Sequence, residues 1–197
     1  MARAVWRGWG MTDDVLQRQA LLSSSVSTAM TEQFRFLHPS VNAGLKELGV
    51  IPWWTLDDIR ISFFRPLSTL THWLDYQLWP DSHELMHAHS LLWYGGLCAL
   101  VTVFYRRFLG RIPAAGLAAL AFSSSIIHLN FTHSIAGRNV ILAGVFGLLT
   151  LWFHDRWRRE GRRNRALLAL LSMMLALFSA EAGVATVAYL AAYAVFL

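Results

Sequence analysis

The chain has 197 residues, of which 55% are hydrophobic and 15% are charged. Charged residues make up about a quarter of an ordinary soluble domain, so this composition argues against a soluble globular protein. The formal net charge is +5, but the basic residues are not spread over the chain. Residues 1–85 hold seven Lys and Arg against nine Asp and Glu, whereas segments 106–111 and 154–165 together hold nine Arg against two acids. We therefore expect no nucleic-acid partner and interpret the two basic segments as signals of membrane topology.

The first 85 residues divide into short predicted helices rather than membrane spans. Asp13 and Asp14 precede a segment typical of a helix with acids in its first turn. A short amphipathic helix should begin at Pro39. A second one should end near Trp79, and its tryptophans favour the membrane–water interface, although an ordinary soluble amphipathic helix has the same spacing. We expect an extracytoplasmic region made of amphipathic helices.

The remaining residues, 86–197, alternate apolar runs with short polar segments. The runs cover 90–104, 112–127, 139–153, 166–180 and 184–197. A span needs roughly 20 residues to cross about 30 Å of hydrocarbon, and flanking Trp, Tyr, Arg and His can supply the turns that these shorter runs lack. The sequence therefore predicts an all-α, polytopic membrane bundle with about five spans. The alternative is a set of buried core helices in a large soluble protein.

The basic segments indicate which side of the membrane each loop occupies. Arginine-rich loops stay in the cytoplasm, and these two segments are separated by two apolar runs, as alternation requires. Residues 1–85, the polar segment 128–138 and the turn at Glu181 then lie outside. A translocated first region needs a preceding span, and the last residues fall within an apolar run, so we expect further spans on both sides. We predict a multi-pass protein of a bacterial inner membrane, with the lipid bilayer as a partner.

Most residues with candidate chemistry fall on the predicted outer side. Asp13 and Asp14 offer a general base or ligands for a divalent cation, although acids are also common at helix starts because they suit the helix dipole. Arg65 follows two phenylalanines and is typical of a lipid-phosphate ligand or of an interfacial anchor. His133 and Arg138 share one short outer loop, and an arginine at a helix start needs a compensating anion. We expect these residues to bind a phosphate-bearing substrate.

Glu181 lies between two apolar runs. An ionisable residue near membrane depth indicates a function and needs a partner, unless it reaches solvent at the turn. We expect that partner to be Arg138 or a bound ligand. Helix packing would then gather Glu181, Arg138 and one of the two aspartates around a single cavity.

Residues 83–87 read HELMH and match the H-E-x-x-H pattern. On a helix this spacing places His83 and His87 on one face for zinc, with Glu84 beside them as a general base, so a membrane zinc metallopeptidase is an alternative function. The same residues have a structural explanation, because Asp81 and Glu84 have the spacing of a capping box at a helix start. No third-ligand motif follows in the sequence, and our preferred prediction assigns no metal site here.

Five short motifs follow one another in an order typical of a known family. They are DDV at 13–15, FFRPLSTLTHWLDYQLW at 63–79, MHAHSLLWY at 86–94, HLNFTHSIAGRNVIL at 128–142 and SAEAG at 179–183. Together they resemble the N-terminal portion of the GT-C superfamily of polytopic membrane glycosyltransferases. The resemblance is to the O-mannosyltransferase-like group, which includes the tetratricopeptide-containing transmembrane mannosyltransferases. Family members have a serine-lysine-glutamate turn, and Ala180 stands in place of that lysine here.

The resemblance implies transfer of a sugar from a polyprenyl-phosphate carrier, with the general base at Asp13 or Asp14. The base would deprotonate an acceptor hydroxyl, and Arg138 together with Arg65 would offset the charge of the leaving lipid phosphate. No cofactor is implied beyond the divalent cation that the aspartates could hold. A non-catalytic membrane scaffold is a further alternative.

Overall fold

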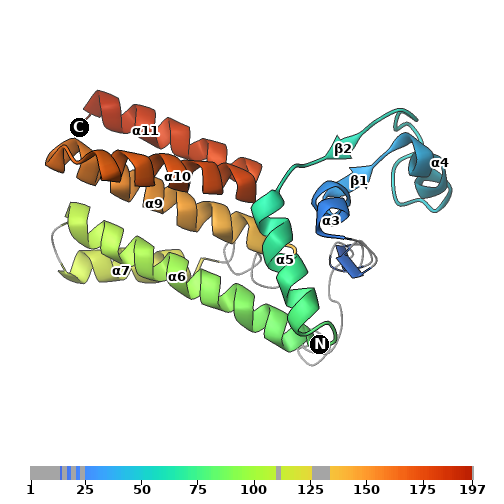
Figure 1. The fold of residues 1–197 in the computed structure, drawn as a ribbon, viewed down its shortest axis with the longest axis horizontal. Coiled ribbons are helices and arrows are strands. Elements are labelled where there is room, and N and C mark those ends of the chain that lie inside the picture. The colour runs from blue at the N-terminus through green and yellow to red at the C-terminus, as the bar shows by residue number, and fades with distance from the viewer. Residues whose placement is uncertain are drawn as a thin grey trace.

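The computed structural model describes residues 14, 17, 18, 21, 22, 25–109, 112–125 and 134–196. These residues are mostly helical, which confirms the predicted helical character of the chain. Figure 1 shows a bundle of long helices and a smaller arm that extends beyond one end of the bundle. Helix α5 (Pro66–Leu78) lies across that end, between the bundle and the arm.

The arm contains a departure from an all-helical fold. Strands β1 (Arg35–Leu37) and β2 (Ile61–Ser62) form an antiparallel pair, with Arg35 opposite Ser62. Helix α3 (Val26–Glu32) leads into β1. The all-α prediction is therefore wrong for this short ladder, because strands of two and three residues leave no alternating pattern to recognise.

Helix α4 (Pro39–Glu47) lies between the two strands and begins at the predicted residue. Asn42 of this helix is buried, and its side-chain amide donates to the carbonyl groups of Asp57 and Ile59, both at 2.9 Å. These hydrogen bonds fix the loop that returns to β2. Polar contacts thus help to hold the arm together.

Helix α5 is amphipathic, as its spacing predicted, but it turns its polar side inward. Its buried residues are Ser68, Thr69, His72, Asp75 and Tyr76. Its exposed large side chains include Leu70, Leu74 and Leu78. A helix on the surface of a soluble protein has the opposite orientation, because its apolar stripe faces the core.

Two helices form the first part of the bundle, α6 (His83–Leu109) and α7 (Ile112–Ser123). The hydroxyl of Ser82 caps α6 by accepting from the amide of Leu85. The predicted capping box is therefore wrong in its first member, because the cap is Ser82 rather than Asp81. Helices α6 and α7 pack against each other, and α6 also packs against the second part of the bundle.

Helices α9 (Arg138–Glu160) and α10 (Arg163–Ser179) form the second part and pack closely together. A tight turn joins them at Gly161, whose φ of 68° is a left-handed conformation that glycine adopts without strain. The predicted loop 154–165 is therefore mostly helical, and α6 likewise continues into the first basic segment, as far as Leu109. Arginine is a good helix former, so a basic segment need not be a loop.

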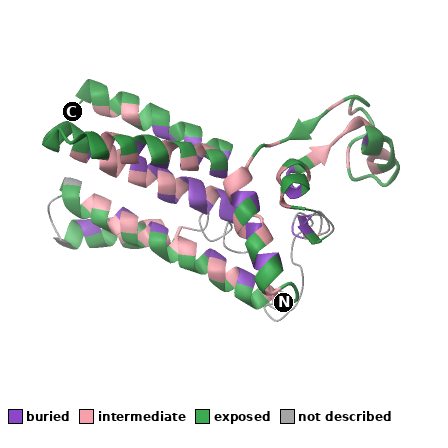
Figure 2. Ribbon diagram, in the orientation of Figure 1, coloured by how far each residue is buried: buried purple, intermediate pink, exposed green. Residues whose placement is uncertain are grey.

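Small side chains make the contact between α10 and its neighbours. Its buried residues are Ala169, Ser172, Ala176 and Ser179. Its exposed large side chains are Leu167, Leu170, Leu171, Met174 and Phe178. A short 3-10 helix, η1 (Glu181–Val184), precedes α11 (Ala185–Phe196), and a Cβ on Gly183 would lie 2.6 Å from the carbonyl oxygen of Ala176. In Figure 2 the outward faces of α10 and α11 are largely exposed.

Among the described residues, one helical segment is long and apolar enough to cross a bilayer, His83–Arg107 of α6. The segments Pro113–Ser123 and Glu181–Phe196 are apolar but shorter. The predicted set of about five spans therefore stays a prediction. The predicted domain boundary between residues 85 and 86 falls within the first turn of α6.

Candidate functional site

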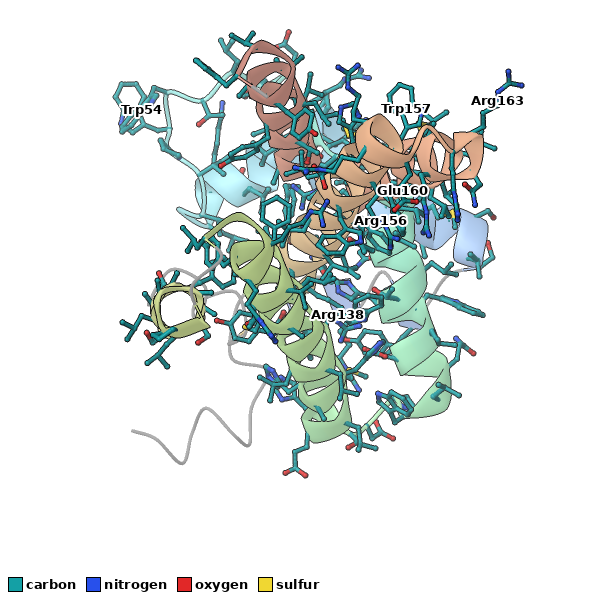
Figure 3. All side chains as sticks on the ribbon, turned by 90° about the vertical axis from the view of Figure 1, so that its left-hand side faces the viewer. Trp54, Arg138, Arg156, Trp157, Glu160 and Arg163 are labelled. Carbon is teal, nitrogen blue, oxygen red and sulfur yellow. The ribbon has the colours of Figure 1, made fainter. Side chains whose placement is uncertain are left out.

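A buried ion pair between Arg138 and Asp75 lies at the centre of the site. Arg138 is the first residue of α9, its side chain is fully buried, and its Nη2 lies 2.5 Å from Oδ2 of Asp75 on α5. Its Nε donates to Oγ of Ser90 at 2.9 Å, and Nη2 donates to the carbonyl oxygen of Met86 at 2.8 Å. Nη1 donates to the carbonyl oxygen of Thr71 at 3.4 Å. Figure 3, which looks along the bundle, shows Arg138 among the helices, where these contacts join α5, α6 and α9.

Asp75 also orients a histidine. Its Oδ1 lies 2.6 Å from Nδ1 of His89, and Nε2 of His89 lies 3.0 Å from Nε1 of Trp93. An indole N–H can only donate, so Nε2 of His89 accepts and its ring proton sits on Nδ1, facing Asp75. The order Arg138, Asp75, His89, Trp93 thus runs from a buried cation to a partly exposed histidine and its indole partner.

His72 lies one turn before Asp75 on α5, and its imidazole stays neutral. Burial lowers its pKa well below the usual 6.5, and the charge of Arg138 and the neighbouring His89 lower this pKa further. Its Nδ1 accepts from Nε2 of Gln33 at 2.5 Å, and the same amide nitrogen donates to Oε1 of Gln17 at 2.9 Å. This polar chain ties the N-terminal segment to α5 without adding charge to the site.

Asp14 is the described member of the predicted acidic pair, and it is buried. Its Oδ1 accepts from Oγ of Ser134 at 2.8 Å and from the amide of Ala136 at 2.9 Å, which holds the segment just before α9. Its Oδ2 is buried and has no hydrogen-bond partner among the described residues. Asp14 is also close enough to Arg138 to attract it electrostatically. The structure therefore brings Asp14 and Arg138 to the same end of the bundle.

Arg65 and Glu181 form a second, more exposed pair at the start of α5. Nη2 and Nε of Arg65 lie 2.6 and 2.9 Å from Oε2 of Glu181. The guanidinium also lies 4.8 and 4.6 Å from the ring centres of Phe34 and Phe63, which hold it by cation–π contact. Partial burial acts to raise the pKa of Glu181, but the hydrogen bonds and charge of Arg65 outweigh burial and lower this pKa. Nη1 of Arg65 donates to no described residue, and the Arg65 side chain is 15% exposed.

The predicted contact between Arg138 and Glu181 is wrong. Arg138 instead pairs with Asp75 on α5, and Glu181 pairs with Arg65 at the start of the same helix. Ten residues separate the two partners, which is about 15 Å along a helix axis. These charges therefore form two separate pairs held by one helix.

The remaining predicted site residues divide between described and undescribed positions. Asp13 and His133 lie outside the described residues, and their roles stay predictions. His83 and His87 lie on one face of α6, with ring centres 4.3 Å apart, while Glu84 is exposed. Within the described part of the chain, no three His, Cys, Asp or Glu side chains form a group that could hold a metal ion. The described residues thus supply neither a third zinc ligand nor a site for the divalent cation.

Neither Asp75 nor His72 is among the predicted site residues, although both prove central to the site. A signal for them is present in the sequence, because Ser68, His72 and Asp75 recur every three to four residues and form one polar stripe of the helix. The leucines of the same helix give the amphipathic spacing from which the helix was predicted, and the polar stripe was not used. A polar stripe within an otherwise apolar segment is therefore the feature that would have located the ion pair.

Comparison of the chain with protein families, with curated proteins and with solved structures found no match. The functional interpretation therefore depends on the geometry of the site and on the resemblance of its motifs.

Proposed function

We propose that the chain is a multi-pass membrane protein that transfers a sugar from a polyprenyl-phosphate carrier to an acceptor hydroxyl on the outer side of the membrane. The observation that carries this proposal is the position of Asp14. Its carboxylate has one oxygen without a described partner, and it lies at the polar end of a bundle whose outward faces are apolar. A general base for a membrane-bound donor needs this position, at the end of a span rather than within the hydrocarbon.

The orientation of the side chains supports the membrane part of the proposal. Helices α5 and α10 expose leucines and bury Ser, Thr and Ala, which is how helices pack in a bilayer. Exposing those leucines to water would cost a free energy of about 25 cal/mol per Å² of apolar surface. Only 17% of the apolar window of α6 is buried, so α6 is not enclosed like a core helix. Arginines gather where α9 ends and α10 begins, and this end is then cytoplasmic.

In the proposed reaction Asp14 takes the proton of the acceptor hydroxyl while the acceptor oxygen attacks the anomeric carbon of the sugar. The bond between that carbon and the phosphate oxygen breaks, and polyprenyl phosphate leaves with the bonding electrons. Arg65 offsets the charge on the leaving phosphate through Nη1, which has no described partner. Arg138 acts as a positioning residue, since its donors are engaged by Asp75 and by its other internal partners.

Sugar transfer from a defined donor tests the proposal. The chain is reconstituted in vesicles that contain polyprenyl-phosphate mannose, and turnover and donor binding are measured separately. Asp14→Asn should lower turnover at least about a hundredfold with little change in donor binding, because a general base acts in the transition state. Arg65→Gln should weaken donor binding as well as turnover, because its charge meets the phosphate in both states.

Two variants serve as controls. Ser134→Ala removes one hydrogen bond to Asp14 but keeps the carboxylate, and it should retain most of the turnover. Asp58→Asn changes an exposed acid of the arm and should have no effect. Wild-type turnover in both site variants, or no transfer by correctly inserted wild-type chain, contradicts the proposal. The non-catalytic scaffold is then the better account.

A further inference from the structure

An apolar groove of about 600 Å³ runs along α9 between α6 and α11. On α9 its lining extends from Val140 to Leu151, which is about 17 Å along the helix axis. That length is close to one leaflet of a bilayer, half of about 30 Å of hydrocarbon. The lining is aliphatic and aromatic, so the groove suits a chain of hydrocarbon rather than a polar ligand.

One end of the groove adjoins a cluster of arginines. Tyr193 of α11 lines the groove, and its hydroxyl donates to Oδ1 of Asp155 at 3.0 Å. Asp155 also pairs with Arg107 at 2.5 Å and with Arg159 at 2.7 Å. Two guanidinium groups share this single carboxylate, so the end of the groove has an excess of positive charge. Arg158 adds an exposed arginine that is close enough to interact electrostatically with Tyr193.

We propose that this groove binds an anionic phospholipid of the cytoplasmic leaflet. Its acyl chains lie along α9, and its phosphate meets Arg107, Arg158 and Arg159. Basic pockets between membrane helices attract anionic headgroups in this way. At the opposite end of the bundle Arg138 is buried and paired, so its guanidinium offers nothing to a headgroup. The inference rests on the proposed membrane insertion, but not on sugar transfer.

The chain offers a matched pair of variants for each part of the ligand. Ala192 is exposed and lines the groove, whereas the exposed Ala191 beside it is not part of the lining. Ala192→Trp therefore fills the groove, and Ala191→Trp adds the same bulk outside it. Arg158→Gln removes charge near the headgroup, and Arg163→Gln removes the same charge from a side chain that extends away from the bundle in Figure 3.

Native mass spectrometry counts the bound lipids directly. Delipidated, purified chain is titrated in detergent with either dioleoyl phosphatidylglycerol or dioleoyl phosphatidylcholine. The wild type should retain one phosphatidylglycerol and prefer it at least about tenfold, as expected for several arginines near one phosphate. Ala192→Trp should weaken phosphatidylglycerol binding at least about tenfold, and Arg158→Gln should reduce the preference about fivefold. Ala191→Trp and Arg163→Gln should behave like the wild type.

Equal binding of the two lipids overturns the proposal, because the arginines then select no headgroup. The same conclusion follows if the two control variants lose as much binding as Ala192→Trp and Arg158→Gln. A lipid-free dimer that Ala192→Trp dissociates would show that a second copy fills the groove instead. None of these outcomes depends on sugar transfer, so the two proposals fail separately.

Discussion

The two ends of the bundle each enclose a buried carboxylate, but they hold its arginine partners differently. Asp75 pairs with Arg138, whose side chain is fully buried. Asp155 pairs with Arg107 and Arg159, whose side chains are 30% and 60% exposed. Both carboxylates are almost inaccessible, so the difference between the two ends lies in the arginines.

This difference separates an end whose arginine is enclosed with its partner from an end whose arginines can also contact other molecules. At Asp75 the charges cancel within the protein, so losing either partner leaves an uncompensated buried charge. At Asp155 the arginines keep contact with their surroundings, where they can meet an anionic headgroup or water. Burial of the partner, rather than pairing itself, therefore determines what each pair contributes to stability.

The largest effect is expected from Asp75→Asn. The variant keeps the shape of the side chain but leaves Arg138 buried without its counter-charge, which should cost about 3–5 kcal/mol in the free energy of unfolding. Denaturation in detergent micelles measures this loss. The double variant with Arg138→Gln should lose clearly less than the sum of the single variants, because the two residues act as a pair. A loss below about 1 kcal/mol for Asp75→Asn would show that the ion pair is not buried as described.

A smaller effect is expected from Asp155→Asn at the other end. Arg107 and Arg159 can hydrate when the carboxylate is removed, so the loss should be about 1–2 kcal/mol, mostly from the hydrogen bonds to Asp155. The same denaturation experiment measures it. Equal losses for Asp155→Asn and Asp75→Asn would contradict the distinction between the two ends.

The smallest effect is expected from Glu181→Gln, which breaks the half-exposed pair with Arg65. Screening limits the contribution of such a pair to under about 1 kcal/mol at neutral pH. The pKa of Glu181 is lowered from 4.5 in the folded protein, so this stability is present above that value and is lost as the pH falls through the folded pKa. Wild type and variant should therefore differ at pH 7 and converge once the pH falls below the folded pKa. A difference that persists in acid would point to a role for Glu181 other than its charge.

The sequence predicted the helices better than their contacts. Proline and helical spacing located α5 almost to the residue, and proline likewise marked the start of α4. The partner of Arg138 could not be predicted in the same way, because an amphipathic pattern defines two faces of a helix without saying which one turns inward. Here the polar face of α5 turns inward and brings Asp75 to the bundle, the reverse of the rule for soluble proteins.

The basic segment 154–165 teaches a related lesson. Its arginines located a cluster of positive charge, but the prediction that they form a loop was wrong. Arginine is accommodated in a helix as readily as in a loop. The short ladder of β1 and β2 and the polar chain through His72 lay beyond prediction for another reason. Both depend on contacts between segments far apart in the sequence, which no local pattern encodes.

Cysteine accessibility tests the central claim most directly, namely that the two ends of the bundle lie on opposite sides of a membrane. In a Cys98→Ala background, single cysteines replace the exposed residues Ser40, on the arm, and Arg163, at the arginine end. A membrane-impermeant maleimide is then added to intact spheroplasts of a bacterial host. The account predicts that Ser40→Cys is modified at once and that Arg163→Cys is modified only after the membrane is permeabilised. Labelling of both cysteines in intact cells, or the reverse order, would contradict it.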